Sequence, residues 1–177
     1  METLKISSAA SKGKLLTIVC VAVLVFGCQP LLFDLRGHTV PEAKRIAIPD
    51  SREKLGVYNN EDITLTYKMT RTPGLLIISG EIHFADRIAE NFPVIQYFHL
   101  DAILIDAQGK VRDVAGVTTF GYYHTEYVTP SDYPPTFNTP ITVPENTQSI
   151  AFSYTGRAFD ATGSGVGGMD FWEYPVY

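Results

Sequence analysis

The chain has 177 residues, of which 45% are hydrophobic, 12% aromatic and 19% charged, with 14 Lys and Arg against 19 Asp and Glu. This length fits one domain with a short extra segment, and the apolar content excludes an intrinsically disordered chain. Nucleic-acid-binding proteins neutralise phosphates with clustered Lys and Arg. The acidic balance and the lack of such a cluster therefore argue against a nucleic-acid partner.

Residues 1–27 have the order of a secretory signal peptide. Three lysines precede an apolar run from Leu15 to Phe26, which is followed by Gly27 and Cys28. A basic region, a short apolar region and a small residue before the processing point are typical of such signals. We therefore expect this segment to direct the chain to a membrane.

The stretch Leu24-Val25-Phe26-Gly27-Cys28 resembles the lipobox of bacterial lipoproteins. The resemblance implies that the Cys28 thiol receives a diacylglyceryl group and that a peptidase cuts just before Cys28. It also implies that the new amino terminus receives an acyl chain such as palmitate. The protein would then be lipid-anchored in a bacterial cell envelope, and Gln29 after the cysteine resembles the sorting pattern for the outer membrane. The other cysteine, Cys20, has no small residue before it and is not the expected acceptor.

Two other interpretations of this segment stay open. The first is an ordinary cleaved signal with an unmodified Cys28. The second is an uncleaved anchor helix over residues 15–33, although Gly27 and the residues to Pro30 interrupt the apolar run. A spanning helix needs about 20 largely apolar residues, and the run is shorter than that.

Cleavage before Cys28 changes the charge of the protein. The remaining 150 residues hold 11 Lys and Arg and 18 Asp and Glu, so the net charge is 11 minus 18, about −7. If the Cys28 sulfur holds lipid, no thiol remains for a disulfide, a thiolate metal site or a cysteine nucleophile. A domain of about 150 residues buries enough surface to fold without such links.

Residues 28–60 show little periodicity and include several prolines and mixed charges. We expect a tether here, with an early edge strand at residues 45–48 as an alternative. Beyond it, apolar and polar residues alternate, as expected for half-buried strands. The predicted strands cover residues 62–69, 76–84, 97–106, 110–119, 120–128, 150–154 and 169–175.

Other segments are predicted to connect these strands. Asp86 to Phe92 could form a short helix before Pro93, and five prolines between Pro130 and Pro144 predict a long crossing loop. The fold class is therefore all-β, an antiparallel β-sandwich of about seven strands over residues 61–177. The segments 141–144 and 149–154 resemble late strands of immunoglobulin-like or fibronectin-like domains.

His83 and His99 are weak candidates for metal ligands. They fall on the polar faces of successive predicted strands, with Glu81 and Asp101 nearby, and imidazoles with carboxylates suit a divalent ion if those strands pair. The spacing matches no metal motif, so no metal is expected. The glycines of residues 163–168 match G-x-G-x-x-G, but a strand follows them where a dinucleotide site needs a helix, so no cofactor is expected.

Aromatic residues are candidates for binding. The cluster comprises Tyr122, Tyr123, Tyr127, Tyr133 and Phe137, and Trp172 lies in the last predicted strand. Such side chains stack on sugars or anchor a protein partner, because they supply large, stiff contact areas. The alternative is that they pack the core or the proline-rich loop.

The sequence has no G-x-S-x-G elbow and no H-E-x-x-H helix, so we expect a protein that is not an enzyme. The leading hypothesis is a lipid-anchored envelope protein whose domain is an interaction or structural module with an envelope protein partner. The second is an accessory lipoprotein that binds a ligand, a glycan or a metal. An envelope hydrolase is a third.

Overall fold

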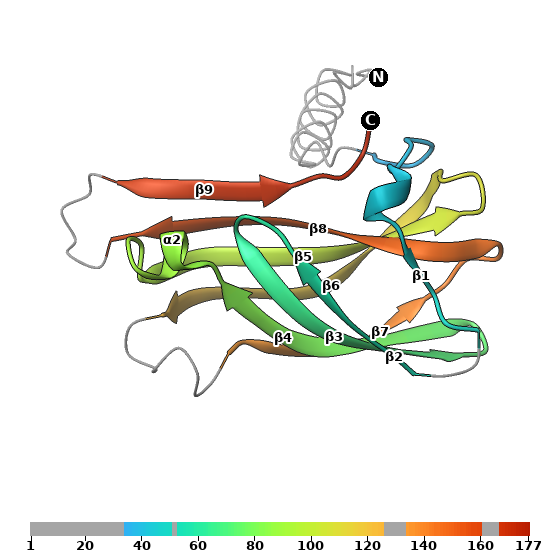
Figure 1. Cartoon of the computed structure of the whole chain (residues 1–177), viewed down its shortest axis with the longest axis horizontal. Helices are drawn as coiled ribbons and strands as arrows, with labels where there is room; N and C mark the ends of the chain where they lie inside the picture. Colours follow the sequence, from blue (N-terminus) through green and yellow to red (C-terminus); the bar gives the residue numbers. More distant parts are fainter. Residues whose placement is uncertain (1–33, 51–52, 126–133, 161–166) are drawn as a thin grey trace, which may run out of the picture. The chain divides into compact units, whose positions relative to one another are not determined.

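The computed structural model describes residues 34–50, 53–125, 134–160 and 167–177. Strands dominate these residues, and only two short helical segments accompany them (Figure 1). The strands are β1 (Ile46–Ala47), β2 (Lys54–Asn59), β3 (Ile63–Thr72), β4 (Leu75–Phe84), β5 (Val94–Asp106), β6 (Val111–His124), β7 (Thr136–Thr142), β8 (Thr147–Phe159) and β9 (Gly168–Glu173). The helical segments are η1 (Glu42–Lys44) and α2 (Asp86–Ala89).

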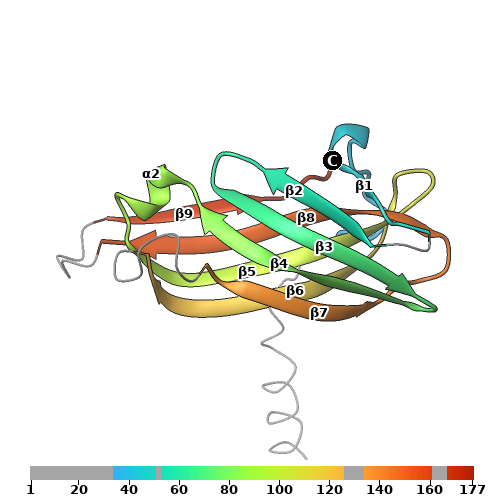
Figure 2. The same ribbon diagram turned by 60° about the horizontal axis from the view of Figure 1, so that its bottom comes forward.

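The strands form two antiparallel sheets. In the five-stranded sheet, β8, β5 and β6 follow one another, and β1 and β9 pair with different parts of β8. The four-stranded sheet has the order β2, β3, β4, β7. Figures 1 and 2 show the two sheets as separate layers. The all-β antiparallel class predicted from the sequence is confirmed, and the immunoglobulin-like type stays a prediction.

The predicted alternation holds in the central strands. In β3, Ile63, Leu65 and Met69 are fully buried, and the threonines between them are not. In β5, Phe98, Leu100, Ala102 and Leu104 lie in the core, and His99 and Asp101 face outward. Successive side chains of a strand point to opposite faces, so these patterns indicate which face of each sheet packs.

The main core lies between the two sheets and contains residues from both. Tyr67 of β3 meets Phe152 of β8 edge-on with ring centroids 5.4 Å apart, and Phe84 of β4 meets Phe98 of β5 at the same separation. Burying each such side chain stabilises the fold by about 1.5–3 kcal/mol, and edge-to-face geometry adds to that.

A second, smaller core covers part of the outer face of the five-stranded sheet. Val40 from the N-terminal segment and Val176 near the C-terminus pack with Ile103, Ile105 and Ala151 on this outer face, among other residues. The backbone of Tyr177 donates to Thr39, which ties the C-terminus to the same segment. One half of this outer face is therefore covered, and the half around His99 stays accessible.

The compact unit begins at Leu35, within the segment that the sequence analysis assigned to the tether of residues 28–60. The strands β1 and β2 both lie in that range and pair with β8 and β3. Val40 and Ile48 are buried on either side of Pro41. The strand β1 is too short to show a period, and the apolar residues Leu55 and Val57 of β2 lie on its exposed side. The predicted signal segment and Cys28 lie outside the described residues, and within the described ranges no helix has the length and apolar character of a membrane span.

Two other expectations need correction. The segment 120–128 does not begin a new strand, because β6 continues through it to His124 with a register shift opposite Leu100 and Asp101. The expected proline loop contains β7, in which Pro140 lies opposite Ile77 of β4. Proline lacks an N–H but is tolerated on an edge strand, and β7 is at the edge of its sheet.

Candidate functional site

The accessible half of the five-stranded sheet presents nine outward-facing side chains, which we call the open face. Pairing register assigns them to one surface, because residues directly opposite each other point to the same side of a sheet. The open face consists of Tyr97, His99 and Asp101 of β5, Thr119 of β6, Ser153, Thr155 and Arg157 of β8, and Asp170 and Trp172 of β9.

These side chains form rows across the sheet. Thr155 lies opposite both His99 and Trp172, and His99 lies opposite Thr119 on its other side. In the next row Arg157 lies opposite both Tyr97 and Asp170. Neighbouring strands are about 4.8 Å apart, so a ligand laid across the sheet could contact a whole row at once.

Two large aromatic side chains are exposed on the open face. Trp172 is 61% exposed and Tyr97 is 41% exposed. Exposed aromatic rings beside polar groups are typical of binding surfaces, because they provide a wide contact area with few rotatable bonds.

His99 is held by hydrogen bonds at both ring nitrogens. Its Nδ1 is 2.5 Å from Thr119 Oγ1, and its Nε2 is 2.9 Å from Asp101 Oδ1. When the ring carries its single proton on Nε2, the Thr119 hydroxyl donates to Nδ1 and Nε2–H donates to the carboxylate. Burial raises the pKa of Asp101 above its ordinary value, although His99 opposes the shift. The imidazole is thus oriented by its neighbours.

Ser153 points to the same side of the sheet but is buried. It lies opposite Asp101, is 1% exposed, and its Oγ has no hydrogen-bond partner among the described residues. A buried hydroxyl left in this state costs about 1–3 kcal/mol. Two rows away from Ser153, Arg157 Nη1 and Asp170 Oδ1 are 3.5 Å apart.

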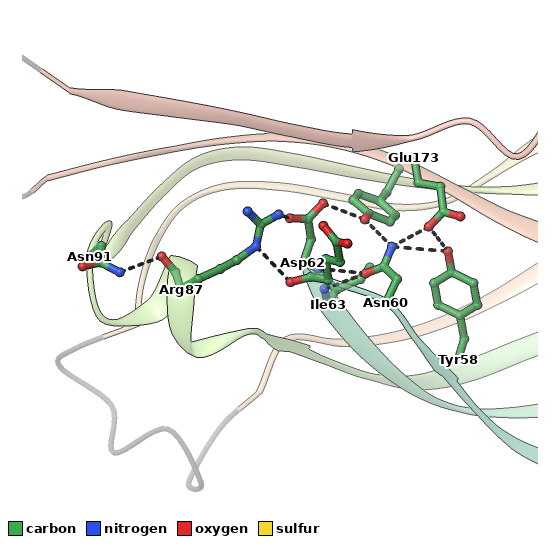
Figure 3. A network of polar contacts seen from close by, with 9 residues as sticks. Tyr58, Asn60, Asp62, Ile63, Arg87, Asn91 and Glu173 are labelled. Carbon is green, nitrogen blue, oxygen red and sulfur yellow. Dashed lines mark hydrogen bonds and ion pairs between the residues drawn. The ribbon is translucent and has the colours of Figure 1, made fainter.

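A second polar cluster links the two sheets at the turn between β2 and β3 (Figure 3). Asn60 donates to Glu173 Oε2 at 2.5 Å and to Tyr154, whose hydroxyl donates to Asp62 at 2.8 Å. Tyr58 donates to Glu173. We call this set, together with Arg87 and Lys44, the clamp network.

Both carboxylates of the clamp network are matched by cations. Arg87 pairs with Asp62, and Lys44 Nζ lies 2.6 Å from Glu173. Burial by itself raises the pKa of Glu173, but hydrogen bonds from Lys44, Tyr58 and Asn60 outweigh burial and lower it. Burial and the Asp62 hydrogen bond raise the pKa of Tyr154. The network joins elements far apart in the chain, and its partners satisfy one another, so we assign it a structural role.

The structure separates the two histidines proposed as metal ligands. His83 is on the outer face of the four-stranded sheet, where its Nε2 is 3.5 Å from Glu81, and His99 is on the outer face of the other sheet. The condition for that candidate site, pairing of the two strands, is not met, because β4 pairs with β3 and β7 instead of β5. Within the described residues, no three His, Cys, Asp or Glu side chains are grouped to hold a metal ion.

The aromatic residues proposed as binding candidates lie in different parts of the structure. Tyr122 is 71% exposed and has a left-handed backbone with φ of 52°, whereas Tyr123 packs on Phe84 and Phe120. Phe137 belongs to the core, and Trp172 belongs to the open face. Tyr127 and Tyr133 lie outside the described residues, as does Cys28.

The sequence analysis missed Tyr97, Ser153 and Arg157 as members of a site. Alternation alone assigns 97, 99 and 101 to one face of a strand and 153, 155 and 157 to one face of another. That these faces join depends on the pairing of β5 with β8.

Comparison of the chain with protein-family models, with curated proteins and with solved structures finds no match. The chemistry of the open face is therefore the basis for a functional proposal.

Proposed function

We propose that this protein is a lipid-anchored component of a bacterial cell envelope and that its β domain is a non-enzymatic binding module. The binding surface is the open face. The observation that supports this most directly is the exposure of Trp172 and Tyr97 on one sheet surface, with hydrogen-bonding side chains between them.

Exposed aromatic side chains on this sheet favour a binding role over a purely structural one. The other half of the same outer face shows what a covered surface looks like in this protein, since Val40 and Val176 pack there against aliphatic residues. On the open face, the apolar surface of Trp172 remains in water. Burying that surface would stabilise the protein by about 25 cal/mol for each Å². A ligand that covers the ring recovers that free energy.

The anchor rests on the N-terminal sequence. The apolar run before Cys28 and the small residue Gly27 support lipid attachment, which would keep the open face near the membrane surface or the cell wall. A sandwich of immunoglobulin-like type would agree with this role. Substituting Cys28→Ser should abolish incorporation of labelled palmitate and release the protein from membranes; labelling that survives would contradict the anchor.

Binding can be tested with isolated envelope material. Full-length protein in detergent micelles is mixed with purified cell-wall sacculi or with outer-membrane fragments, and the bound fraction is measured after sedimentation. We expect saturable retention that falls about tenfold for Trp172→Ala, the loss of roughly one aromatic anchor. The matched control is Leu55→Ala, which truncates a side chain that is 75% exposed on the other sheet. Equal retention of both variants would contradict the proposal.

The non-enzymatic part has its own test. Many hydrolases use a hydroxyl hydrogen-bonded to an imidazole that is hydrogen-bonded in turn to a carboxylate. Thr119, His99 and Asp101 are hydrogen-bonded in the same way. We expect no turnover of p-nitrophenyl acetate above that of a Thr119→Val variant. Turnover lost in that variant would contradict a pure binding module.

A further inference from the structure

We infer that the ligand of the open face is an oligosaccharide that stacks on Trp172 and Tyr97 and hydrogen-bonds to the polar side chains between and beside them. This inference rests on the proposed function and identifies the class of ligand. It is argued from the spacing of the rings, the arrangement of donors and acceptors, the charge of the surface and the glycines of β6.

The two rings are placed for a chain of linked sugars. Trp172 and Tyr97 are on strands separated by β8 and are offset by one row along the strands. One row along a face is two residues, so with strands about 4.8 Å apart and about 3.4 Å per residue their backbones are about 12 Å apart. The C–H face of a pyranose stacks on an aromatic ring, and linked sugars could reach both rings.

The polar side chains between and beside the rings combine donors with acceptors. Arg157 offers a planar set of N–H donors beside the carboxylate of Asp170, and His99 is beside Asp101. Each sugar hydroxyl is both a donor and an acceptor, so adjacent hydroxyls can bond to both members of such a pair. The hydroxyls of Thr119 and Thr155 extend the same rows.

The balance of charge argues against an anionic ligand. The open face has one fixed cation, Arg157, beside Asp170, and a second carboxylate, Asp101, beside His99, so the named side chains have no excess of positive charge. A polyanion is bound by an excess of positive charge. A largely neutral ligand with many hydroxyls fits this surface better.

The distribution of apolar groups argues against a protein partner. Protein interfaces have an apolar centre surrounded by a polar rim. On the open face, Thr155 and His99 lie in the row that Trp172 begins, and Arg157 lies between Tyr97 and Asp170. Aromatic and polar side chains are therefore neighbours on the open face. A sugar ring has the matching arrangement, because its C–H face lies beside its hydroxyl groups.

Glycine in β6 keeps the central pair uncovered. Gly116 lies opposite Asp101, and a Cβ there would be 3.9 Å from Asp101 Oδ1 and 4.0 Å from the His99 ring. Those are ordinary contact distances, so the fold has room for a side chain at this position. A larger side chain would, however, stand over the His99–Asp101 pair and block a ligand.

The experiment uses full-length protein in a zwitterionic detergent without a sugar head group. Cellohexaose, chitohexaose and maltohexaose are titrated separately, and binding is followed by calorimetry and by the emission of Trp172, the single tryptophan of the chain. We expect at least one of them to bind saturably, with Kd raised about tenfold in Trp172→Ala and in Tyr97→Ala. Kd should change less than about twofold in Leu55→Ala, since additivity holds for distant sites.

Gly116→Val provides a test that does not remove any contact. Valine favours strands, so the melting temperature should stay at or above that of the unmodified protein while oligosaccharide binding is lost. Thermal denaturation of every variant confirms that it is folded. If Gly116→Val does not fold, Gly116→Ala and Tyr97→Ala are used instead to test whether the ligand binds at this surface.

The outcomes separate this inference from the proposed function. If none of the three oligosaccharides binds while retention on envelope material still requires Trp172, the ligand is not a sugar chain of these classes and the inference is overturned, but the binding face stands. If an oligosaccharide binds equally to Trp172→Ala, Tyr97→Ala and Gly116→Val, the site is elsewhere and the inference is also overturned. If retention itself does not depend on Trp172, both proposals fail.

Discussion

Asp62 and Asp101 show how its environment determines what a carboxylate does in this protein. Asp62 is buried, pairs with Arg87 and accepts a hydrogen bond from Tyr154, so its role is to hold elements together. Asp101 is partly buried on an outer face and is hydrogen-bonded to His99. Partial burial of a group that is not needed for packing is a frequent property of binding sites.

Asp101→Asn should therefore separate stability from binding. Because the folded state raises the pKa of Asp101 above its ordinary 3.8, the folded protein binds this proton more tightly than the unfolded chain does. Protonated Asp101 therefore adds to the free energy of unfolding below pH 3.8, and this contribution is lost as pH rises through the folded pKa. At neutral pH the ionised Asp101 carboxylate destabilises the fold. We expect Asp101→Asn to retain or gain melting temperature at pH 7 and to lose oligosaccharide binding. A clear loss of stability would mean that the bond to His99 is structural.

Glu173 should show the opposite dependence on pH. Its pKa is lowered below the ordinary 4.5, so its contribution is present above pH 4.5 and is lost as pH falls through the folded pKa. The free energy of unfolding, measured by urea denaturation between pH 7 and pH 3, should fall less steeply in Glu173→Gln than in the unmodified protein. Glu145→Gln, at an exposed turn position, is the control. Parallel curves for Glu173→Gln and the unmodified protein would contradict the role assigned to Lys44, Tyr58 and Asn60.

Among the elements, β9 is the one on which the candidate site depends most. It pairs with β8, and its alternate residues have different tasks: Phe171 enters the core, Glu173 joins the clamp network, and Asp170 and Trp172 face outward. One strand thus determines both the packing of an edge and the position of the tryptophan.

Gly156→Ala should loosen β9. A Cβ on Gly156 would collide with the ring of Phe171, and overpacking of a core costs about 1–3 kcal/mol. We expect a lower melting temperature and a shift in the emission of Trp172. Gly116→Ala is a matched control, because the same substitution in β6 meets only ordinary contact distances. Equal stability of the two variants would show that Phe171 adjusts without cost.

At the scale of the whole molecule, two kinds of contact join the two sheets. Aromatic pairs such as Tyr67 with Phe152 fill the space between the sheets, and the clamp network connects the β2–β3 turn to β8 and β9. Hydrogen bonds in a buried network support one another, so the loss of one member affects elements in both sheets.

Tyr154→Phe tests this connection. The variant keeps the buried ring but removes the hydroxyl that donates to Asp62 and accepts from Asn60. We expect a loss of about 1–3 kcal/mol in the free energy of unfolding, because the buried Asp62 and the partly buried Asn60 each lose a partner. Chemical denaturation measures it, with Tyr122→Phe at an exposed position as the control. A change below about 0.5 kcal/mol would contradict the structural role, since surface substitutions have effects of that size.

Much of the fold could be predicted because alternation is a local property of a strand. The inward faces of residues 63–69 and 98–104 follow from their order alone, and so does the turn at Gly109, where φ is 81°. The strand β1 was harder to detect because two residues show no period, and β2 because its apolar residues Leu55 and Val57 lie on its exposed side. Pro140 was misleading because its cost depends on whether β7 is an edge strand.

The sequence by itself therefore determined the all-β class, the faces of the central strands, and the N-terminal pattern on which the proposed anchor at Cys28 depends. Tertiary structure decided which strands are neighbours, and with that which side chains meet. His99 lies in the row of Trp172 because β8 pairs with both β5 and β9, and it is separated from His83 because β4 belongs to the other sheet. Such pairing depends on contacts between residues far apart in the chain, which no local pattern specifies.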